Sequence, residues 1–264
     1  MRKRIFITND DGFESLGLKA LIEAVKDLGE ILVVAPGSEK SACGHSLTLT
    51  RPLRFIKLDD NFYKLEDGTP TDCVYLALNV FYDKIKPDLI ISGINRGANM
   101  GEDITYSGTA AAAMEGAIYN IPSIAISQVC NSNCEKTEIE IGYDLAKKAA
   151  KEIASKVLKD GMPLGNRKFL NINVPPIKIK DFRGYKITKA GYRLYANDAH
   201  LHRNPRGLEY WWLGVHPLEW KRNGKKDCDF EAVKDGFVSI TPIKADLTAY
   251  EEIKRLKEWI SNEV

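Results

Sequence analysis

Two adjacent aspartates, Asp10 and Asp11, end the first apolar run of the chain and are followed by Gly12. Side-by-side carboxylates repel each other, so a protein that keeps both charges at one point needs something to balance them. A divalent cation is the simplest balance. If this run is a strand of an open α/β sheet, its carboxyl end is also where such sheets bind ligands.

Two further oxygen-bearing side chains follow later apolar runs: Ser41 comes after residues 31–35, and Asn95 comes after residues 88–92. With Asp10 and Asp11 they make a set of carboxylate, hydroxyl and amide oxygens. Such ligands suit hard cations, namely Mg²⁺, Mn²⁺ or Ca²⁺, rather than zinc. The alternative is that Asp11 begins a turn and that Asp10 caps the next helix.

A possible phosphate cradle lies at Ser107-Gly108-Thr109, which precedes four alanines. Small residues at the start of a helix leave free N–H groups and the positive end of the helix dipole open to an anion. An ordinary capped helix packed by alanines would give the same residues. Arg96, in the glycine- and asparagine-rich loop 93–101, could neutralise a phosphate or lie free on the surface.

Other motifs carry weaker signals. His45 stands in Cys43-Gly44-His45-Ser46, and a lone histidine is more often structural than catalytic. Cys43 is a candidate nucleophile by proximity alone. No GxGxxG follows the first apolar run and no Walker A motif is present, so the dinucleotide and P-loop fingerprints are absent.

The elements that must position these residues alternate in the first half of the chain. We predict strands at residues 4–8, 31–35, 88–92 and 123–127, and helices at 18–28, from 70, at 109–119 and at 138–158. The second helix should start at the capping box Thr69-Pro70-Thr71-Asp72. This alternation predicts an α/β fold with a Rossmann-like, doubly wound, mostly parallel sheet. In such a sheet, the polar side chains that follow the predicted strands converge on the edge formed by the carboxyl ends of those strands.

The regular alternation of predicted strands and helices ends after about residue 165. Strands are expected at 169–174, 185–193, 208–214 and 236–243, and a final helix at 247–260. We therefore predict a catalytic core over 1–165, and remaining core strands plus a smaller C-terminal β-hairpin and helix extension over 166–264. Residues 194–227, rich in aromatic and basic side chains, form an excursion. They could bind nucleic acid, but an oligomer contact is favoured.

Composition sets limits on the class of protein. The chain has 264 residues, a formal net charge of +2 and 44% hydrophobic residues, so nothing global argues for nucleic acid or a membrane. Only a strand-length apolar run follows the basic start, so we expect a cytoplasmic protein without a signal peptide. The five cysteines are expected to be reduced, and the four histidines lack zinc-finger spacing.

Segments spread over nearly the whole chain carry a family signature. They are Thr8-Asn9-Asp10-Asp11-Gly12, Val34-Ala35-Pro36, Ser41-Ala42-Cys43-Gly44-His45-Ser46, Ser92-Gly93-Ile94-Asn95-Arg96-Gly97, Asn99-Met100-Gly101, Tyr106-Ser107-Gly108-Thr109, Glu115-Gly116-Ala117, Leu170-Asn171-Ile172-Asn173-Val174-Pro175, Val238-Ser239-Ile240-Thr241-Pro242 and Asp246-Leu247-Thr248. Together they resemble the SurE family of survival-protein phosphatases, which are 5′-nucleotidases, that is, nucleoside monophosphate phosphohydrolases. Cys43 stands where a small residue such as threonine is usual.

The resemblance implies a metal-dependent phosphomonoesterase that releases phosphate from nucleoside monophosphates, and possible activity on short polyphosphate. It implies one divalent ion, Mg²⁺ or Mn²⁺, and assembly into a homodimer or homotetramer, often by exchange of elements. The implied metal ligands are Asp10, Asp11, Ser41 and Asn95, with both aspartates as catalytic candidates. The implied phosphate ligands are Asn99, Ser107, Gly108 and Thr109, and possible additional residues are Asn9, Arg96 and His45.

We expect metal-assisted hydrolysis, in which Asp10 or Asp11 accepts the proton of the attacking water. A haloacid-dehalogenase-like phosphatase would need a nucleophilic aspartate at position 9, where the chain has Asn9. A receiver-like domain would need an aspartate after residues 88–91, where the chain has Ser92-Gly93. A non-catalytic nucleotide- or phosphate-binding module would use the same groups and differs only in turnover.

Overall fold

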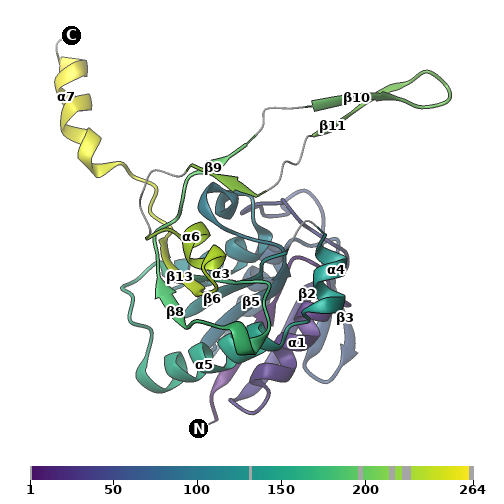
Figure 1. The fold of residues 1–264 in the computed structure, drawn as a ribbon. Coiled ribbons are helices and arrows are strands. Elements are labelled where there is room, and N and C mark those ends of the chain that lie inside the picture. The colour runs from purple at the N-terminus through teal and green to yellow at the C-terminus, as the bar shows by residue number, and fades with distance from the viewer. Residues whose placement is uncertain (1, 131–132, 196–198, 214–217, 222–226, 262–264) are drawn as a thin grey trace.

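The computed structural model describes residues 2–130, 133–195, 199–213, 218–221 and 227–261. These residues form a nine-stranded sheet in the order β3-β4-β2-β1-β5-β6-β7-β13-β8, covered by helices on both faces (Figure 1). The predicted doubly wound α/β fold is therefore confirmed.

The middle of the sheet is parallel throughout. Its strands are β4 (Phe62–Glu66), β2 (Glu30–Pro36), β1 (Arg4–Thr8), β5 (Leu89–Arg96), β6 (Ser123–Gln128) and β7 (Lys168–Val174). At one edge β3 (Arg54–Asp59) runs antiparallel to β4. At the other edge β13 (Val238–Lys244) runs antiparallel to β7, and β8 (Tyr185–Ile187) pairs with β13. All carboxyl ends of the parallel strands thus meet at one rim.

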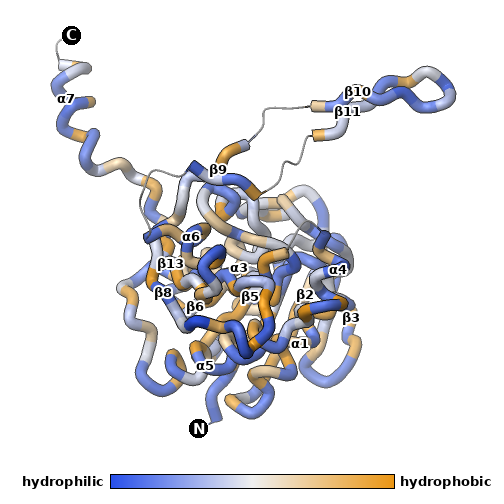
Figure 2. The backbone as a smooth tube through the Cα atoms, in the orientation of Figure 1, coloured by the Kyte–Doolittle hydropathy of each residue, from blue (hydrophilic) through white to orange (hydrophobic). Residues whose placement is uncertain are grey.

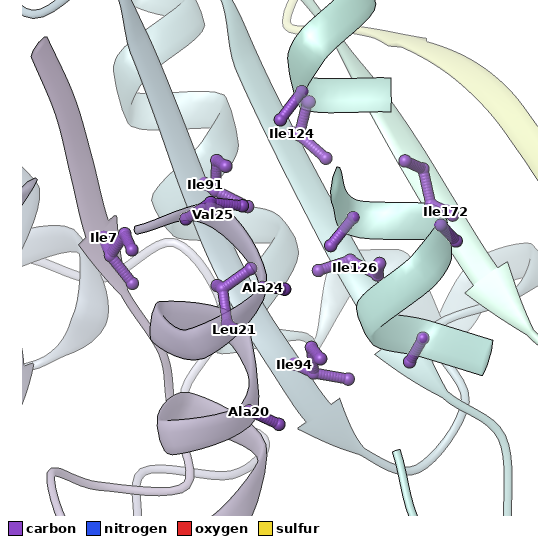
Figure 3. Close-up of a cluster of buried hydrophobic side chains, with 14 of the residues drawn as sticks. Ile7, Ala20, Leu21, Ala24, Val25, Ile91, Ile94, Ile124, Ile126 and Ile172 are labelled. Atoms are coloured by element: carbon purple, nitrogen blue, oxygen red, sulfur yellow. The ribbon is translucent and has the colours of Figure 1, made fainter. Parts of the chain in front are cut away.

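Among the described residues, two long helices pack on each face of the sheet. The residues of α1 (Leu16–Val25) and α5 (Asp144–Asp160) form one core with isoleucines of the central strands, several of which Figure 3 shows around Leu21. The opposite face is covered by α2 (Pro70–Val80) and α3 (Gly108–Ile118). The capping box predicted for α2 is confirmed, because Thr69 and Asp72 each accept from the other's backbone N–H.

Three predicted elements differ from the structure. The helix expected at 138–158 is two helices, α4 (Cys134–Glu140) and α5, because Gly142 adopts a φ of +67°, which a helix cannot contain. The strand expected at 185–193 is two short strands, β8 and β9 (Arg193–Leu194). The last helix, α7 (Ile253–Ser261), starts six residues later than expected and follows a 3₁₀ turn at Tyr250–Glu252.

Several short elements were not predicted. They are the 3₁₀ helices Gly101–Thr105 and Ile179–Asp181, the strands β10 (Ala199–Arg203) and β12 (Glu219–Trp220), and the helix α6 (Asp229–Lys234). The 3₁₀ helices, β12 and α6 are too short to leave a clear period in the sequence, and β10 has no run of apolar residues. The predicted strand at 208–214 is β11 (Glu209–Leu213), and its last residue lies outside the described residues.

The excursion predicted at 194–227 leaves the body as the β10–β11 hairpin (Figure 1). Residues 196–198, 214–217 and 222–226 of this region lie outside the described part. The helix α7 also projects from the body, and the described side chains of both elements are exposed. Hydrophobic positions remain uncovered on them, whereas in the body such positions gather inside (Figure 2).

The expectation that all cysteines are reduced is wrong for one pair. Cys130 and Cys134 form a disulfide with their Cα atoms 4.9 Å apart, within the normal range. The two cysteines lie four residues apart, Cys130 shortly after the end of β6 and Cys134 at the start of α4. Among the described residues, none of the helices has the length and apolar character needed to cross a bilayer.

Candidate active site

The carboxyl rim of the sheet holds a cavity of about 230 Å³. The predicted metal ligands Asp10, Ser41 and Asn95 line it, and so do the predicted phosphate ligands Asn99 and Ser107. The structure therefore brings together side chains that follow three different strands and precede one helix, as the convergence of parallel strand ends requires.

Asp11 faces a neighbouring space. It lines a cavity of about 460 Å³ together with Glu39 and Arg96, and Arg96 also lines the cavity that holds Asp10. Asp10 and Asp11 thus line two different cavities, and Arg96 lines both of them.

Asp10 is held by the start of helix α3. Its Oδ2 accepts from the backbone N–H of Thr109 at 3.0 Å, and its Oδ1 accepts from the Thr109 hydroxyl. Burial raises the pKa of Asp10, and the Thr109 hydrogen bonds oppose this rise. The approach needs Gly108, because a Cβ there would lie 2.8 Å from the Asp10 Cβ. The helix end predicted to bind phosphate therefore also orients a candidate metal ligand.

Asp11 is less enclosed. One carboxylate oxygen accepts from the backbone N–H of Arg96 at 3.0 Å. Burial and the nearby charge of Asp10 raise the pKa of Asp11 from the usual 3.8 to about 7. Two neighbouring carboxylates that resist joint ionisation are a suitable place for a cation, which would balance both charges.

The other two predicted metal ligands complete an oxygen donor set. The Asn95 Nδ2 donates to the Gly97 carbonyl at 3.0 Å, and its Oδ1 has no hydrogen-bond donor among the described residues. The Ser41 hydroxyl donates to Glu39 Oε1 at 2.9 Å and is exposed. No three His, Cys, Asp or Glu side chains of the described chain gather as a metal site, so a cation here would use amide and hydroxyl oxygens as well. This set fits Mg²⁺ or Mn²⁺.

Three of the predicted phosphate ligands, Ser107, Gly108 and Thr109, lie at the start of helix α3, and the fourth, Asn99, lies in the wall of the cavity. Ser107 caps helix α3, because its Oγ accepts from the Ala110 N–H at 3.0 Å, and Gly108 opens the helix. Thr109 is fully buried and directs both its donors at Asp10. Asn99 is buried at the cavity wall.

The possible additional residues have defined partners. Asn9 lies behind the rim, where its Nδ2 donates to the Gly12 carbonyl and to Ser15 Oγ at 2.9 and 2.8 Å. The Arg96 guanidinium lies 3.7 Å from Glu138. His45 Nε2 lies 2.8 Å from Oε2 of the buried Glu115 on α3.

Cys43 does not suit a nucleophile. Burial raises the pKa of its thiol to about 11, so the reactive thiolate is scarce at neutral pH.

Sequence reasoning missed two residues that support the site. Asn171 and Asn173 on β7 are fully buried and hydrogen bond the backbone of Asn99. The available signal was the alternation Leu-Asn-Ile-Asn-Val, which puts two amides on one face of a strand that is otherwise apolar.

The fold and the rim define a class: a doubly wound α/β protein with an oxygen-rich acidic site beside a helix N-terminus. The family model described as "Survival protein SurE" matches residues 5–197. The chain therefore belongs to the SurE family, and the predicted resemblance is confirmed.

Individual relatives agree over their full length. The 5′-nucleotidase SurE of a Nitratiruptor species is 71% identical, and the match covers 98% of this chain and 100% of that one. The 5′-nucleotidase SurE of Helicobacter hepaticus is 61% identical over 98% of this chain and 99% of its own. The crystal structure of the SurE protein from Aquifex aeolicus is 41% identical, with a TM-score of 0.82 over 97% of this chain and 99% of that chain.

Proposed function

We propose that this protein is a 5′-nucleotidase, a metal-dependent phosphoric monoester hydrolase that converts nucleoside monophosphates to nucleoside and phosphate. The observation that carries the proposal is one cavity lined both by Asp10, Ser41 and Asn95 and by Ser107 at the start of α3. Oxygen ligands for a hard cation and an anion-binding helix end belong together in phosphate-ester hydrolysis. The names of the relatives at 71% and 61% identity support the same reaction.

Asp10, Asp11, Ser41 and Asn95 would hold one divalent ion, Mg²⁺ or Mn²⁺. When bound, that ion supplies positive charge next to a phosphoryl oxygen and lowers the pKa of a water molecule. Asn95 Oδ1, which no described donor reaches, supports this assignment. Since both Asp10 oxygens accept from Thr109, its carboxylate is fixed in one orientation before any ligand arrives.

The remaining residues of the rim bind the substrate and move the proton. Ser107 and Gly108 present the N-terminus of α3 to the phosphate, and Asn99 adds an amide donor from the wall of the same cavity. Arg96 offsets the phosphate charge. Asp11 is the general base that accepts the proton of the attacking water, because a single described hydrogen bond, from the Arg96 N–H, engages its carboxylate. Asp10, engaged twice by Thr109, orients rather than accepts.

The proposal extends to the domain organisation, the assembly and the location of the enzyme. Residues 1–165 form the catalytic core, and residues 166–264 supply the last core strands and the extension. Exposed apolar side chains on the β10–β11 hairpin and on α7 support a homodimer or homotetramer. We place the protein in the cytoplasm and expect no nucleic-acid partner.

A substrate panel tests the proposal. Purified protein is assayed for phosphate release from 5′- and 3′-nucleoside monophosphates and short polyphosphate, with Mg²⁺ or Mn²⁺ and with EDTA. We expect turnover of at least one nucleoside monophosphate that EDTA abolishes and the metal restores. Asp10→Ala and Asn95→Ala should lower it by at least about 100-fold. Binding without turnover would instead mark a non-catalytic module, and full activity in EDTA would remove the metal role.

A further inference from the structure

A row of polar side chains crosses the sheet. It begins at the candidate metal ligand Asn95 and leads away from the other candidate metal ligands. Asn95 on β5 is in register with Ser127 on β6, Ser127 with Asn173 on β7, and Asn173 with Ser239 on β13. Ser127, Asn173 and Ser239 are fully buried. Burying polar groups inside a sheet lowers stability unless they find partners, so this row calls for an explanation beyond packing.

The row meets the cavity at the backbone of Asn99. The Asn99 N–H donates to Asn173 Oδ1 at 2.9 Å. The Asn99 carbonyl accepts from Asn171 Nδ2 at 2.8 Å and from Asn173 Nδ2 at 3.0 Å. Two side chains of one strand therefore bind both polar backbone atoms of a loop residue more than 70 positions earlier in the chain.

The side chain of Asn99 is fixed by the same row. Its Nδ2 donates to Ser127 Oγ at 2.8 Å, which uses one of the two hydrogens of the amide nitrogen. The second hydrogen has no acceptor among the described residues, and Asn99 lines the cavity together with Ser107 and Asp10. Backbone and side-chain contacts together fix the direction of this donor.

Asn171 is the informative residue, because its side chain makes one described hydrogen bond, to Asn99, and keeps one polar atom unpartnered among the described residues. The residue is fully buried, and its Oδ1 has no hydrogen-bond partner in the described part of the chain. An unsatisfied buried acceptor destabilises the fold, and leucine has nearly the same shape without that acceptor. The one described contact that asparagine gains over leucine is the hydrogen bond to the Asn99 carbonyl.

We infer that Asn171 and Asn173 are positioning residues of the phosphate site, which act by holding Asn99 with its amide toward the substrate phosphate. This inference rests on the proposed function, since it takes Asn99 as a phosphate ligand. A positioning role explains two buried amides at alternate places on β7 and the unpartnered oxygen of one of them. It also gives β7 a part in catalysis although no atom of β7 lines the cavity.

The test replaces Asn171 with leucine in the full-length chain. Binding of inorganic phosphate is measured by titration calorimetry with saturating Mn²⁺, beside kcat, KM, the Mn²⁺ activation constant and thermal unfolding. We expect the phosphate dissociation constant and KM to rise about tenfold, the effect of one hydrogen bond. The Mn²⁺ constant should stay unchanged, and the unfolding temperature should stay equal or rise.

Ser239→Ala is the matched control, because Ser239 is equally buried, its Oγ is also unpartnered among the described residues, and it makes no hydrogen bond to Asn99. All its binding and kinetic constants should equal those of the unmodified chain. Asn173→Leu removes both a donor and an acceptor, so its phosphate affinity should fall below that of Asn171→Leu.

The outcomes distinguish the positioning role of Asn171 and Asn173 from the proposed function. If the unmodified chain hydrolyses nucleoside monophosphates but Asn171→Leu keeps its phosphate affinity and KM, the positioning role is rejected and the proposed function stands. The positioning role is also rejected if phosphate binding, Mn²⁺ activation and unfolding temperature all decline together, because that pattern marks general damage. An unmodified chain that neither hydrolyses substrate nor binds phosphate overturns both.

Discussion

Thr109 donates two hydrogen bonds to the carboxylate of Asp10, one from its backbone N–H at 3.0 Å and one from its hydroxyl. The two residues lie 99 positions apart, so the contact joins the end of β1 to the start of α3. A fully buried threonine exposes no hydroxyl to substrate in this arrangement. The predicted phosphate role of its hydroxyl thus competes with the orientation of Asp10, and the first prediction separates them.

Replacing Thr109 with valine removes the hydroxyl and keeps the shape. Because a hydrogen bond to a charged group contributes about 1.5–3 kcal/mol, we expect the Mn²⁺ concentration for half-maximal activity to rise at least about tenfold. The phosphate inhibition constant should change little. Thr109→Ser keeps the hydroxyl and should keep the metal constant. A valine variant with normal metal response and weakened phosphate inhibition would return the hydroxyl to the phosphate.

Gly108 permits the contact between α3 and β1. A Cβ at this position would lie 2.8 Å from the Asp10 Cβ and 3.1 Å from the Cys43 Sγ. Gly108→Ala should therefore cost about 1–3 kcal/mol of stability and lower kcat/KM at least about tenfold, through overpacking beside the carboxylate. Gly165→Ala is the control, since the nearest atom there is the mobile Lys168 Nζ at 3.4 Å. Urea unfolding and steady-state kinetics measure both, and equal activity in the two variants would contradict the prediction.

Asp11 predicts how stability of the metal-free protein depends on pH. Its pKa is about 7 in the folded chain and near 3.8 when unfolded, so the folded state binds the extra proton between these values. Stability from this group is present below about pH 4 and is lost as pH rises through 7. In EDTA, the unmodified chain should lose stability relative to Asp11→Asn between about pH 4 and 7, and the difference should level off above pH 7. The free energy of unfolding is measured by urea titration at each pH. If it depends on pH in the same way for the unmodified chain and for Asp11→Asn, the pKa of Asp11 is not raised.

Much of the fold could be predicted because its signals are local. The apolar runs of β1 and β5 and the capping box at Thr69 depend on neighbours a few residues away. The break at Gly142 escaped detection, since an apolar stripe continues across it and one φ angle leaves no period. The Cys130–Cys134 bond was missed because spacing alone does not fix the oxidation state of thiols.

The candidate site shows a similar division. Strand order and the rule for ligand sites predicted that Asp10, Ser41 and Asn95 approach one another, and the cavity contains all three. The pairing of Thr109 with Asp10 and of Asn171 with Asn99 was not foreseeable. Such contacts depend on the rotation of a helix and the register of a sheet, which no local pattern contains.

His45 is expected to act on the loop that carries Ser41. Its Nε2 lies 2.8 Å from Glu115, and Gly44 in the same loop donates its N–H to the Tyr106 carbonyl at 2.9 Å. We expect His45→Ala to loosen the loop and to raise the Mn²⁺ activation constant about twofold to tenfold, with kcat at saturating metal nearly unchanged.

A double-mutant cycle with Glu115→Ala checks this assignment. If the pair acts as one anchor, the double variant should be no worse than either single variant. A His45→Ala enzyme with a collapsed kcat at saturating metal, additive with Glu115→Ala, would instead indicate a direct catalytic histidine.

Helix α7 predicts the assembly state. Its apolar residues Ile253, Leu256, Trp259 and Ile260 recur at helical spacing and are 38–60% exposed. A stripe of this size on a helix that projects from the body lowers its free energy when a second copy covers it. We expect light scattering after size-exclusion chromatography to give a multiple of 29.6 kDa for the unmodified chain.

Leu256→Glu with Trp259→Glu should shift this mass towards a single chain, because two charges would have to be buried in the contact. Lys254→Gln is the control, since Lys254 lies on the opposite side of α7, where it pairs with Glu258 at 3.8 Å, and it should leave the mass unchanged. Since the site lies at the rim of the sheet, the variant should also keep its active-site residues in place. An unmodified chain that already elutes as a monomer would show that the stripe on α7 serves something other than self-association.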